Sequence, residues 1–196
     1  MKEENIDMTV IILVPLAIEE EDKESIFSPL ASHLASIFDA SITIITDPPP
    51  LDRSHPSFDE QRNQLNSDKL LRWLATAVVN NTKSYDDPSK TIILGICDLD
   101  AYSPGLNFVF GQASLTGDVA IVYLPRLRQE FYGEGADRSI FIERVLKEAT
   151  HEVGHAFGLD HCPKWSCVMQ FSNSLADTDR KANDFCKLCR YKLHQK

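Results

Sequence analysis

Residues 151–161 read HExxHxxGxxH, which places three histidines and one glutamate at a spacing that suits a metal site. His151 and His155 are four residues apart, so on a helix both imidazoles project from one face and can reach one ion. Gly158 can adopt a backbone conformation that ends the helix, and the turn would bring His161 back as a third ligand. Three protein ligands leave one zinc position open for water, as in catalytic rather than structural sites.

Glu152 directly follows the first of these histidines and projects to the side of the histidine stripe. From there its carboxylate would reach a metal-bound water rather than the metal, as a general base requires. A bare HExxH also fits a charged helix whose histidines face solvent, so that pattern alone is ambiguous. The added glycine and third histidine favour the metal site, because they stand at the distance that a turning chain needs.

Four of the five cysteines come shortly after the third histidine, in CxxxxC and CxxC pairs: Cys162, Cys167, Cys186 and Cys189. In a reducing compartment such a cluster is better explained by metal than by disulfides. Four thiolates form a closed tetrahedral zinc site, which is structural. The fifth, Cys97, stands in an apolar run and is expected to be a buried small hydrophobe. The sequence thus predicts two zinc ions per chain, one catalytic and one structural.

The two predicted metal sites must be near neighbours. Cys162 directly follows His161, and adjacent Cα atoms are about 3.8 Å apart. We therefore expect the structural zinc to fix His161 through the shared backbone. The same zinc would hold a small C-terminal subdomain, residues 162–196, against a catalytic subdomain of residues 1–161. Such a site can stabilise a fold by on the order of 10 kcal/mol.

Met169 lies between the second and third of the clustered cysteines. Taken alone, it is one more apolar residue that fills space. Together with HExxHxxGxxH and the four interleaved cysteines, it makes the chain resemble the archaemetzincin family of the metzincin zinc peptidases. The resemblance implies that a turn containing Met169 lies beneath the metal. It also implies peptide-bond hydrolysis, with an aminopeptidase or short-peptide preference as a family-level expectation.

Five short segments rich in Val, Ile, Phe or Thr are predicted to be strands: residues 9–14, 41–46, 91–97, 106–110 and 119–124. The long connections between the first three suit crossovers in a parallel sheet. The links around 106–110 are short, so that segment can be an antiparallel edge strand. The resemblance implies the same α/β fold, a five-stranded mixed sheet whose edge strand overhangs the active-site cleft. A peptide substrate could then pair with Leu106, Asn107, Phe108, Val109 and Phe110.

Helical spacing of apolar residues predicts helices over residues 28–38 and 67–80. A Thr or Asp cap would start a further helix over about 176–181. The helix that carries the histidines should start near Asp137 or Ser139. One apolar stripe on it would pack on the sheet: Ile142, Val145, Leu146, Ala149, Val153 and Ala156. The histidines then face the cleft. Arg144 and Glu148 are interpreted as a solvated i,i+4 ion pair on the helix surface. The alternative is that the two residues support the zinc site.

Length and composition suit one domain, or one domain with a small subdomain. The chain has 196 residues, of which 43% are apolar, enough for a full core. No segment is apolar for long enough to cross a bilayer. Residues 1–7 include several acidic side chains and lack the layout of a secretion signal, which predicts a cytoplasmic protein. Residues 47–50 read Asp-Pro-Pro-Pro and predict a stiff surface loop of open role.

The leading hypothesis is a monomeric zinc metallopeptidase that acts on a peptide or protein and binds neither membrane nor nucleic acid. A second class is a non-catalytic, zinc-binding regulatory protein whose four-cysteine knuckle binds a partner. The intact Glu152 argues against it, because a pure binding fold has no need of that carboxylate. A nucleic-acid-binding zinc ribbon is disfavoured by the net charge of −9 and by the lack of aromatics interleaved with the basic tail.

Overall fold

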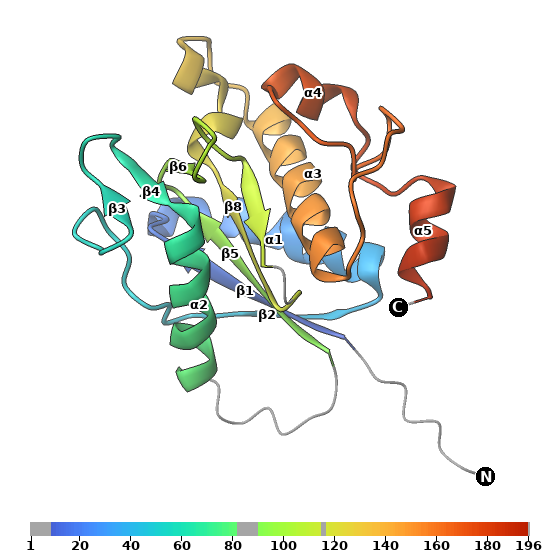
Figure 1. The fold of residues 1–196 in the computed structure, drawn as a ribbon, viewed down its shortest axis with the longest axis horizontal. Coiled ribbons are helices and arrows are strands. Elements are labelled where there is room, and N and C mark those ends of the chain that lie inside the picture. The colour runs from blue at the N-terminus through green and yellow to red at the C-terminus, as the bar shows by residue number, and fades with distance from the viewer. Residues whose placement is uncertain (1–8, 82–89, 115–116, 196) are drawn as a thin grey trace.

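A five-stranded mixed sheet forms the centre of the computed structural model, which describes residues 9–81, 90–114 and 117–195 (Figure 1). Its strands lie in the order β2-β1-β5-β8-β7. They are β1 (Val10–Leu16), β2 (Ser41–Ile44), β5 (Thr91–Cys97), β7 (Gly111–Ala113) and β8 (Val119–Tyr123). The first four in this order are parallel, and β7 pairs antiparallel with β8. The predicted mixed sheet with an antiparallel edge strand is confirmed. Residues 1–7, which carried the prediction of cellular location, lie outside the described ranges.

The edge strand is not where the sequence placed it. Residues 106–110 were predicted to form it, but the strand is Gly111–Ala113, and 106–110 run as an irregular segment. A turn precedes this segment, closed by the Leu106 N–H donating to the Ser103 carbonyl at 2.9 Å. The apolar composition that suggested a strand serves side-chain packing instead, since the rings of Phe108 and Phe110 meet edge to face with centroids 5.1 Å apart.

Helices cover both faces of the sheet, α1 and α3 on one and α2 on the other (Figure 1). Alternate residues of β1 divide accordingly, with Ile11 and Leu13 in the first core cluster and Ile12 and Val14 in the second. The helices are α1 (Glu20–Phe38), α2 (Ser67–Asn81), α3 (Arg138–Ala156), α4 (Leu175–Arg180) and α5 (Lys187–Leu193), with short 3₁₀ turns η1 (Pro125–Leu127) and η2 (Gln129–Tyr132). No helix within the described ranges is long and apolar enough to cross a membrane.

Two features were not predicted. The helix α1 begins at Glu20 rather than at residue 28, and its acidic first turn complements the helix dipole. A second, three-stranded sheet lies beside the first and has the order β3-β4-β6: Phe58–Asp59, Gln64–Asn66 and Ala101–Tyr102. Strands this short carry too few residues for an alternating pattern to be read from the sequence.

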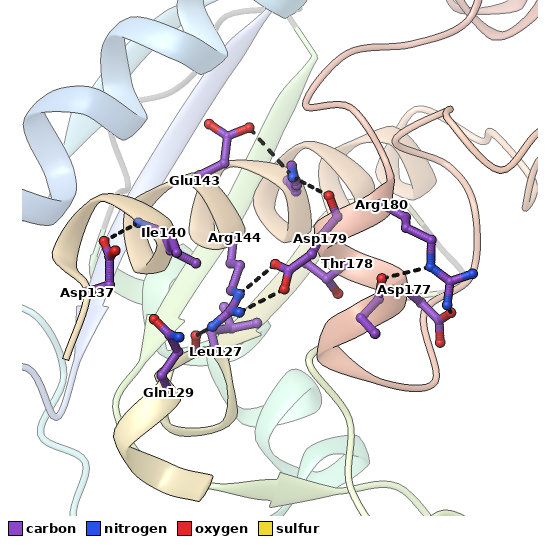
Figure 2. A network of polar contacts seen from close by, with 12 residues as sticks. Leu127, Gln129, Asp137, Ile140, Glu143, Arg144, Asp177, Thr178, Asp179 and Arg180 are labelled. Carbon is purple, nitrogen blue, oxygen red and sulfur yellow. Dashed lines mark hydrogen bonds and ion pairs between the residues drawn. The ribbon is translucent and has the colours of Figure 1, made fainter. Parts of the chain in front are cut away.

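The histidine-bearing helix α3 starts where the Asp137 cap predicts. Asp137 accepts a hydrogen bond from the Ile140 N–H at 3.0 Å (Figure 2). Its residues Phe141, Val145 and Ala149 are buried in the core cluster that α3 shares with the sheet. One face of α3 therefore packs on the sheet, which leaves another face available to line a cleft.

Arg144 and Glu148 are not a solvated pair. They are 4% and 3% exposed, and each has a partner from the C-terminal segment. The Arg144 guanidinium makes two hydrogen bonds to the carboxylate of Asp179 in α4, at 2.7 and 2.8 Å (Figure 2). Glu148 pairs with the fully buried Lys181 at 3.0 Å and accepts a hydrogen bond from the Thr178 hydroxyl at 2.9 Å. The surface expectation was wrong because residues distant in sequence cover this face of α3.

Candidate metal centres

The three motif histidines converge on one point. His151 and His155 lie one turn apart on α3, with their Nε2 atoms 3.1 Å apart. Gly158 takes a positive φ of 77°, which lets the chain turn away after the helix and return with His161. The ligand atoms of the three residues all lie within 4.8 Å of one another. Zinc–nitrogen bonds of about 2.0–2.1 Å in a tetrahedral shell need donors roughly 3.3 Å apart, so this donor set fits a zinc ion.

Carbonyl groups orient two of the imidazoles for metal binding. The Nδ1 of His151 lies 2.8 Å from the Val168 carbonyl oxygen, and that of His155 lies 2.7 Å from the Leu159 carbonyl oxygen. A carbonyl only accepts, so each Nδ1 carries the proton and each Nε2 presents a lone pair. Burial lowers the pKa of all three histidines, well below the usual value for His151. Neutral imidazoles are the form that binds metal.

Glu152 is buried beside this centre and lines the same cleft. Burial raises the pKa of its carboxyl well above the usual value, the neighbouring Glu148 carboxylate raises it further, and the Lys181 ammonium acts in the opposite direction. A carboxyl with a raised pKa takes up a proton more readily than an ordinary one, as a group that accepts and returns a proton must.

Met169 lies directly against the histidine helix. It is fully buried, and a Cβ added to Gly154 would lie 2.5 Å from its sulfur. Gly154 stands between the two helical histidines, so the absent side chain lets Met169 approach the helix backbone beneath them. That Met169 lies beneath a bound metal stays a prediction. Sequence reasoning did not single out Gly154, although the glycine within HExGH was the signal.

The four clustered cysteines form a second group of possible ligands. The sulfurs of Cys162, Cys167, Cys186 and Cys189 lie within 4.8 Å of one another, and none is in a disulfide. The Cys162 and Cys186 sulfurs are 3.9 Å apart, close to the roughly 3.8 Å that tetrahedral Zn–S bonds of about 2.3 Å require. Burial acts to raise the pKa of Cys186, but hydrogen bonds from the Cys189 N–H and the other thiols outweigh it and lower the pKa to about 7. This group fits a structural zinc.

Comparison with known proteins decides the family. The family model of peptidase family M54 matches residues 51–195. Archaemetzincin from Pyrococcus furiosus is 40% identical over 187 residues, which cover 95% of this chain and 93% of that protein. The chain belongs to the archaemetzincin family, peptidase family M54.

Solved structures agree with this archaemetzincin membership. A zinc-dependent peptidase from Methanocorpusculum labreanum superposes with a TM-score of 0.80 at 31% identity, covering 94% of this chain and 99% of that one. Archaemetzincin from Archaeoglobus fulgidus, complexed with malonate, superposes with a TM-score of 0.71 at 37% identity and the same coverage. The resemblance read from the motif is confirmed, and with it the mixed α/β fold.

The archaemetzincin cleft has a volume of about 650 Å³ and runs between the histidines and the segment before β7. The five residues predicted to contact substrate all line it, although they form no strand: Leu106, Asn107, Phe108, Val109 and Phe110. The opposite wall carries His161, whose ring lies 5.0 Å from that of Phe171. Among the residues that the structure describes, those lining this cleft include carboxylates but no lysine or arginine.

Lys181 is a polar residue of the site that sequence reasoning missed, and Glu148 entered that reasoning only through the alternative to a solvated pair with Arg144. Glu148 lies one turn before Glu152 on α3 and lines the cleft. Lys181 pairs with it and also reaches the carbonyl of Gln170, next to Met169, at 3.5 Å. This buried pair therefore connects the histidine helix to the turn that carries the methionine.

Proposed function

We propose that this archaemetzincin family member hydrolyses peptide bonds with a zinc ion held by His151, His155 and His161. The observation that carries the proposal is the convergence of three imidazole donors beside a buried carboxylate at the floor of an open cleft. When bound there, zinc supplies an acidified water and polarises the scissile carbonyl.

Glu152 is the proposed general base. Its carboxylate accepts the proton of the attacking water and later passes it to the leaving amine. The raised pKa of its buried carboxyl supports this role, because the protonated form must persist between the two transfers. His151 and His155 hold their donor atoms in place through the carbonyls of Val168 and Leu159, so the ligands do not have to reorganise during the reaction.

The second proposed zinc is structural and is held by Cys162, Cys167, Cys186 and Cys189. Four thiolates leave no position for water, so this site takes no part in the chemistry. Its role is to hold residues 162–196 on the catalytic part of the chain. The Cys162 thiol belongs to this site while the preceding residue, His161, belongs to the other, and the two zinc sites are therefore coupled through one peptide unit.

We further propose that the enzyme acts from the amino end of its substrate. A carboxypeptidase needs a cation to bind the terminal carboxylate, and the described cleft residues offer none. Asp160 lies exposed at the rim beside the metal site, where it would attract a free α-amino group. The rings of Phe108, Phe110 and Phe171 all line the cleft, which suits apolar side chains of a substrate.

The experiment is hydrolysis of a defined peptide mixture, read by mass spectrometry. We expect cleavage by the zinc-loaded protein, none after chelation, recovery when zinc is restored, and none by Glu152→Gln. Peptides with a blocked amino end should be cut more slowly than their free counterparts, and amidation of the carboxyl end should make little difference. Failure of every peptide to react with zinc-loaded protein would overturn the proposal.

The alternative is a non-catalytic protein that binds a partner through its four-cysteine region. One observation favours it: Trp165, Leu188 and Tyr191 are exposed large apolar side chains that stand in or next to the cysteine loops. It predicts no turnover with any peptide and no effect of Glu152→Gln. The peptide experiment therefore separates the two functions.

A further inference from the structure

The carboxylate of Glu152 packs directly on the backbone of the edge strand at Gly111. A Cβ added to Gly111 would lie 2.5 Å from the Glu152 Oε1, 2.6 Å from its Cγ and 2.8 Å from its Cδ. Real Cβ atoms essentially never approach another heavy atom closer than 3.0 Å. Any side chain at position 111 would therefore force the carboxylate to move.

The backbone at Gly111 does not itself call for glycine. The glycines with positive φ are Gly105, Gly117, Gly133 and Gly158, so Gly111 has a conformation that other residues adopt. It pairs in regular antiparallel register with Val122 of β8. A glycine inside a strand weakens it and usually marks a place where another group approaches closely. Here that group is the Glu152 side chain.

We propose that Gly111 is a positioning residue for Glu152. Because Gly111 has no side chain, the Glu152 carboxylate can lie against the backbone of the edge strand, in the position that the proposed general base needs. This inference rests on the proposed function, since it assigns a position to the base which that function requires. The carboxylate has little freedom elsewhere, because Glu148 lies one turn away on the same helix and is held by Lys181.

A methyl group at position 111 should affect catalysis more than folding. The atoms that must yield belong to a side chain and not to backbone, so β7 and α3 can keep their places. Restoring an ordinary contact would move the carboxylate by about 1 Å, a misplacement that can lower turnover about a hundredfold. The atoms nearest to the added methyl all belong to Glu152 and not to a histidine, so zinc affinity should remain.

The test compares Gly111→Ala with Gly135→Ala, because a Cβ at Gly135 meets nothing within 4 Å. The measurements are kcat and KM on one cleaved peptide, zinc affinity by chelator competition, the thermal unfolding midpoint, and crystal structures of both variants. For Gly111→Ala we expect kcat to fall about a hundredfold with KM and zinc affinity within about twofold, and a displaced Glu152 carboxylate. Gly135→Ala should match the parent protein in every measurement.

A double variant adds a test of mechanism. Glu152→Asp shortens the side chain by one methylene and makes room for the alanine methyl. The kcat losses of Gly111→Ala and Glu152→Asp should therefore combine to less than their product. Should Gly111→Ala fail to fold, Gly111→Ala/Glu152→Ala should fold, because the clashing carboxylate is gone.

Three results would overturn the inference: unchanged kcat in Gly111→Ala, a Glu152 carboxylate that stays in place in its crystal structure, or a double variant with Glu152→Ala that still fails to fold. A kcat loss matched by equal losses of zinc affinity and thermal stability would indicate a structural role instead. Failure of the proposed function looks different, since Glu152→Gln itself would then retain turnover. An inactive Glu152→Gln with a fully active Gly111→Ala removes the positioning role alone.

Discussion

The backbone N–H of Cys162 donates a hydrogen bond of 2.9 Å to the carbonyl oxygen of Met169. This bond joins the first cysteine of one candidate metal site to the Met169 segment, which packs against the helix that carries two residues of the other. The residue before Met169, Val168, orients His151 through its carbonyl. One short backbone segment therefore supports both sites, and disturbance of either should reach the other.

Loss of the four-cysteine site should weaken zinc binding by the histidines. We expect Cys186→Ser/Cys189→Ser to bind zinc at the histidine site about tenfold more weakly or worse, because Cys162 and the Met169 turn lose their support. Chelator competition and a metal count per chain measure this. Cys97→Ala, which removes a buried thiol outside both clusters, is the control. Full occupancy and parental affinity in the double variant would show that the sites are independent.

The Arg144–Asp179 pair should contribute more to stability than a neighbouring ion pair that looks similar in Figure 2. Arg144 is buried while its partner Asp179 is 43% exposed, so Arg144→Ala, which removes the hydrogen bonds of the guanidinium to Asp179 and to the Leu127 carbonyl, should lower the free energy of unfolding by about 2 kcal/mol. Arg180 pairs with Asp177 on the surface, so Arg180→Ala should cost less than about 1 kcal/mol. Denaturant unfolding compares the two variants. Equal losses would contradict the buried role of Arg144.

Several elements could be predicted from the sequence because their signals are local. The histidine motif, the apolar stripe on its helix and the Asp137 cap all lie within one continuous segment, and α3 forms where they indicate. The strand at Thr91–Cys97 likewise matches its prediction, since a buried parallel strand reads as an unbroken apolar run.

The predictions that failed concern residues whose structure depends on contacts with residues distant in the sequence. Residues 106–110 have strand composition, but their side chains line the cleft, and the edge strand paired with β8 spans only Gly111–Ala113. Arg144 read as a surface residue because its partner Asp179 comes from another helix. The closeness of Gly111 to Glu152 is invisible in the sequence for the same reason, since a glycine gives no sign of which group occupies the space it leaves.

Glu152 should make the metal-free protein less stable as pH rises. Burial, followed by the Glu148 carboxylate, raises the pKa of Glu152 in the folded state well above the ordinary value of 4.5. The folded state then holds this proton more tightly than the unfolded chain. The resulting stability is complete below pH 4.5 and is lost as pH rises through the folded-state pKa.

The Glu152→Gln variant has no titratable group at this position, so it does not lose this stability as pH rises. We expect the metal-free variant to gain stability relative to the metal-free parent as pH rises from about 5 to about 8, the interval above the ordinary carboxyl pKa. Urea unfolding of both proteins across this interval measures the difference. A stability difference that does not change with pH would contradict the raised pKa.

The most direct measurement of the central claim is anomalous diffraction at the zinc absorption edge from crystals of the zinc-loaded protein. The account predicts two peaks per chain. One should lie within bonding distance of the Nε2 atoms of His151, His155 and His161, and the other should lie among the four cysteine sulfurs. A crystal with zinc at the cysteines and no peak between the three imidazoles, even after a zinc soak, would contradict it.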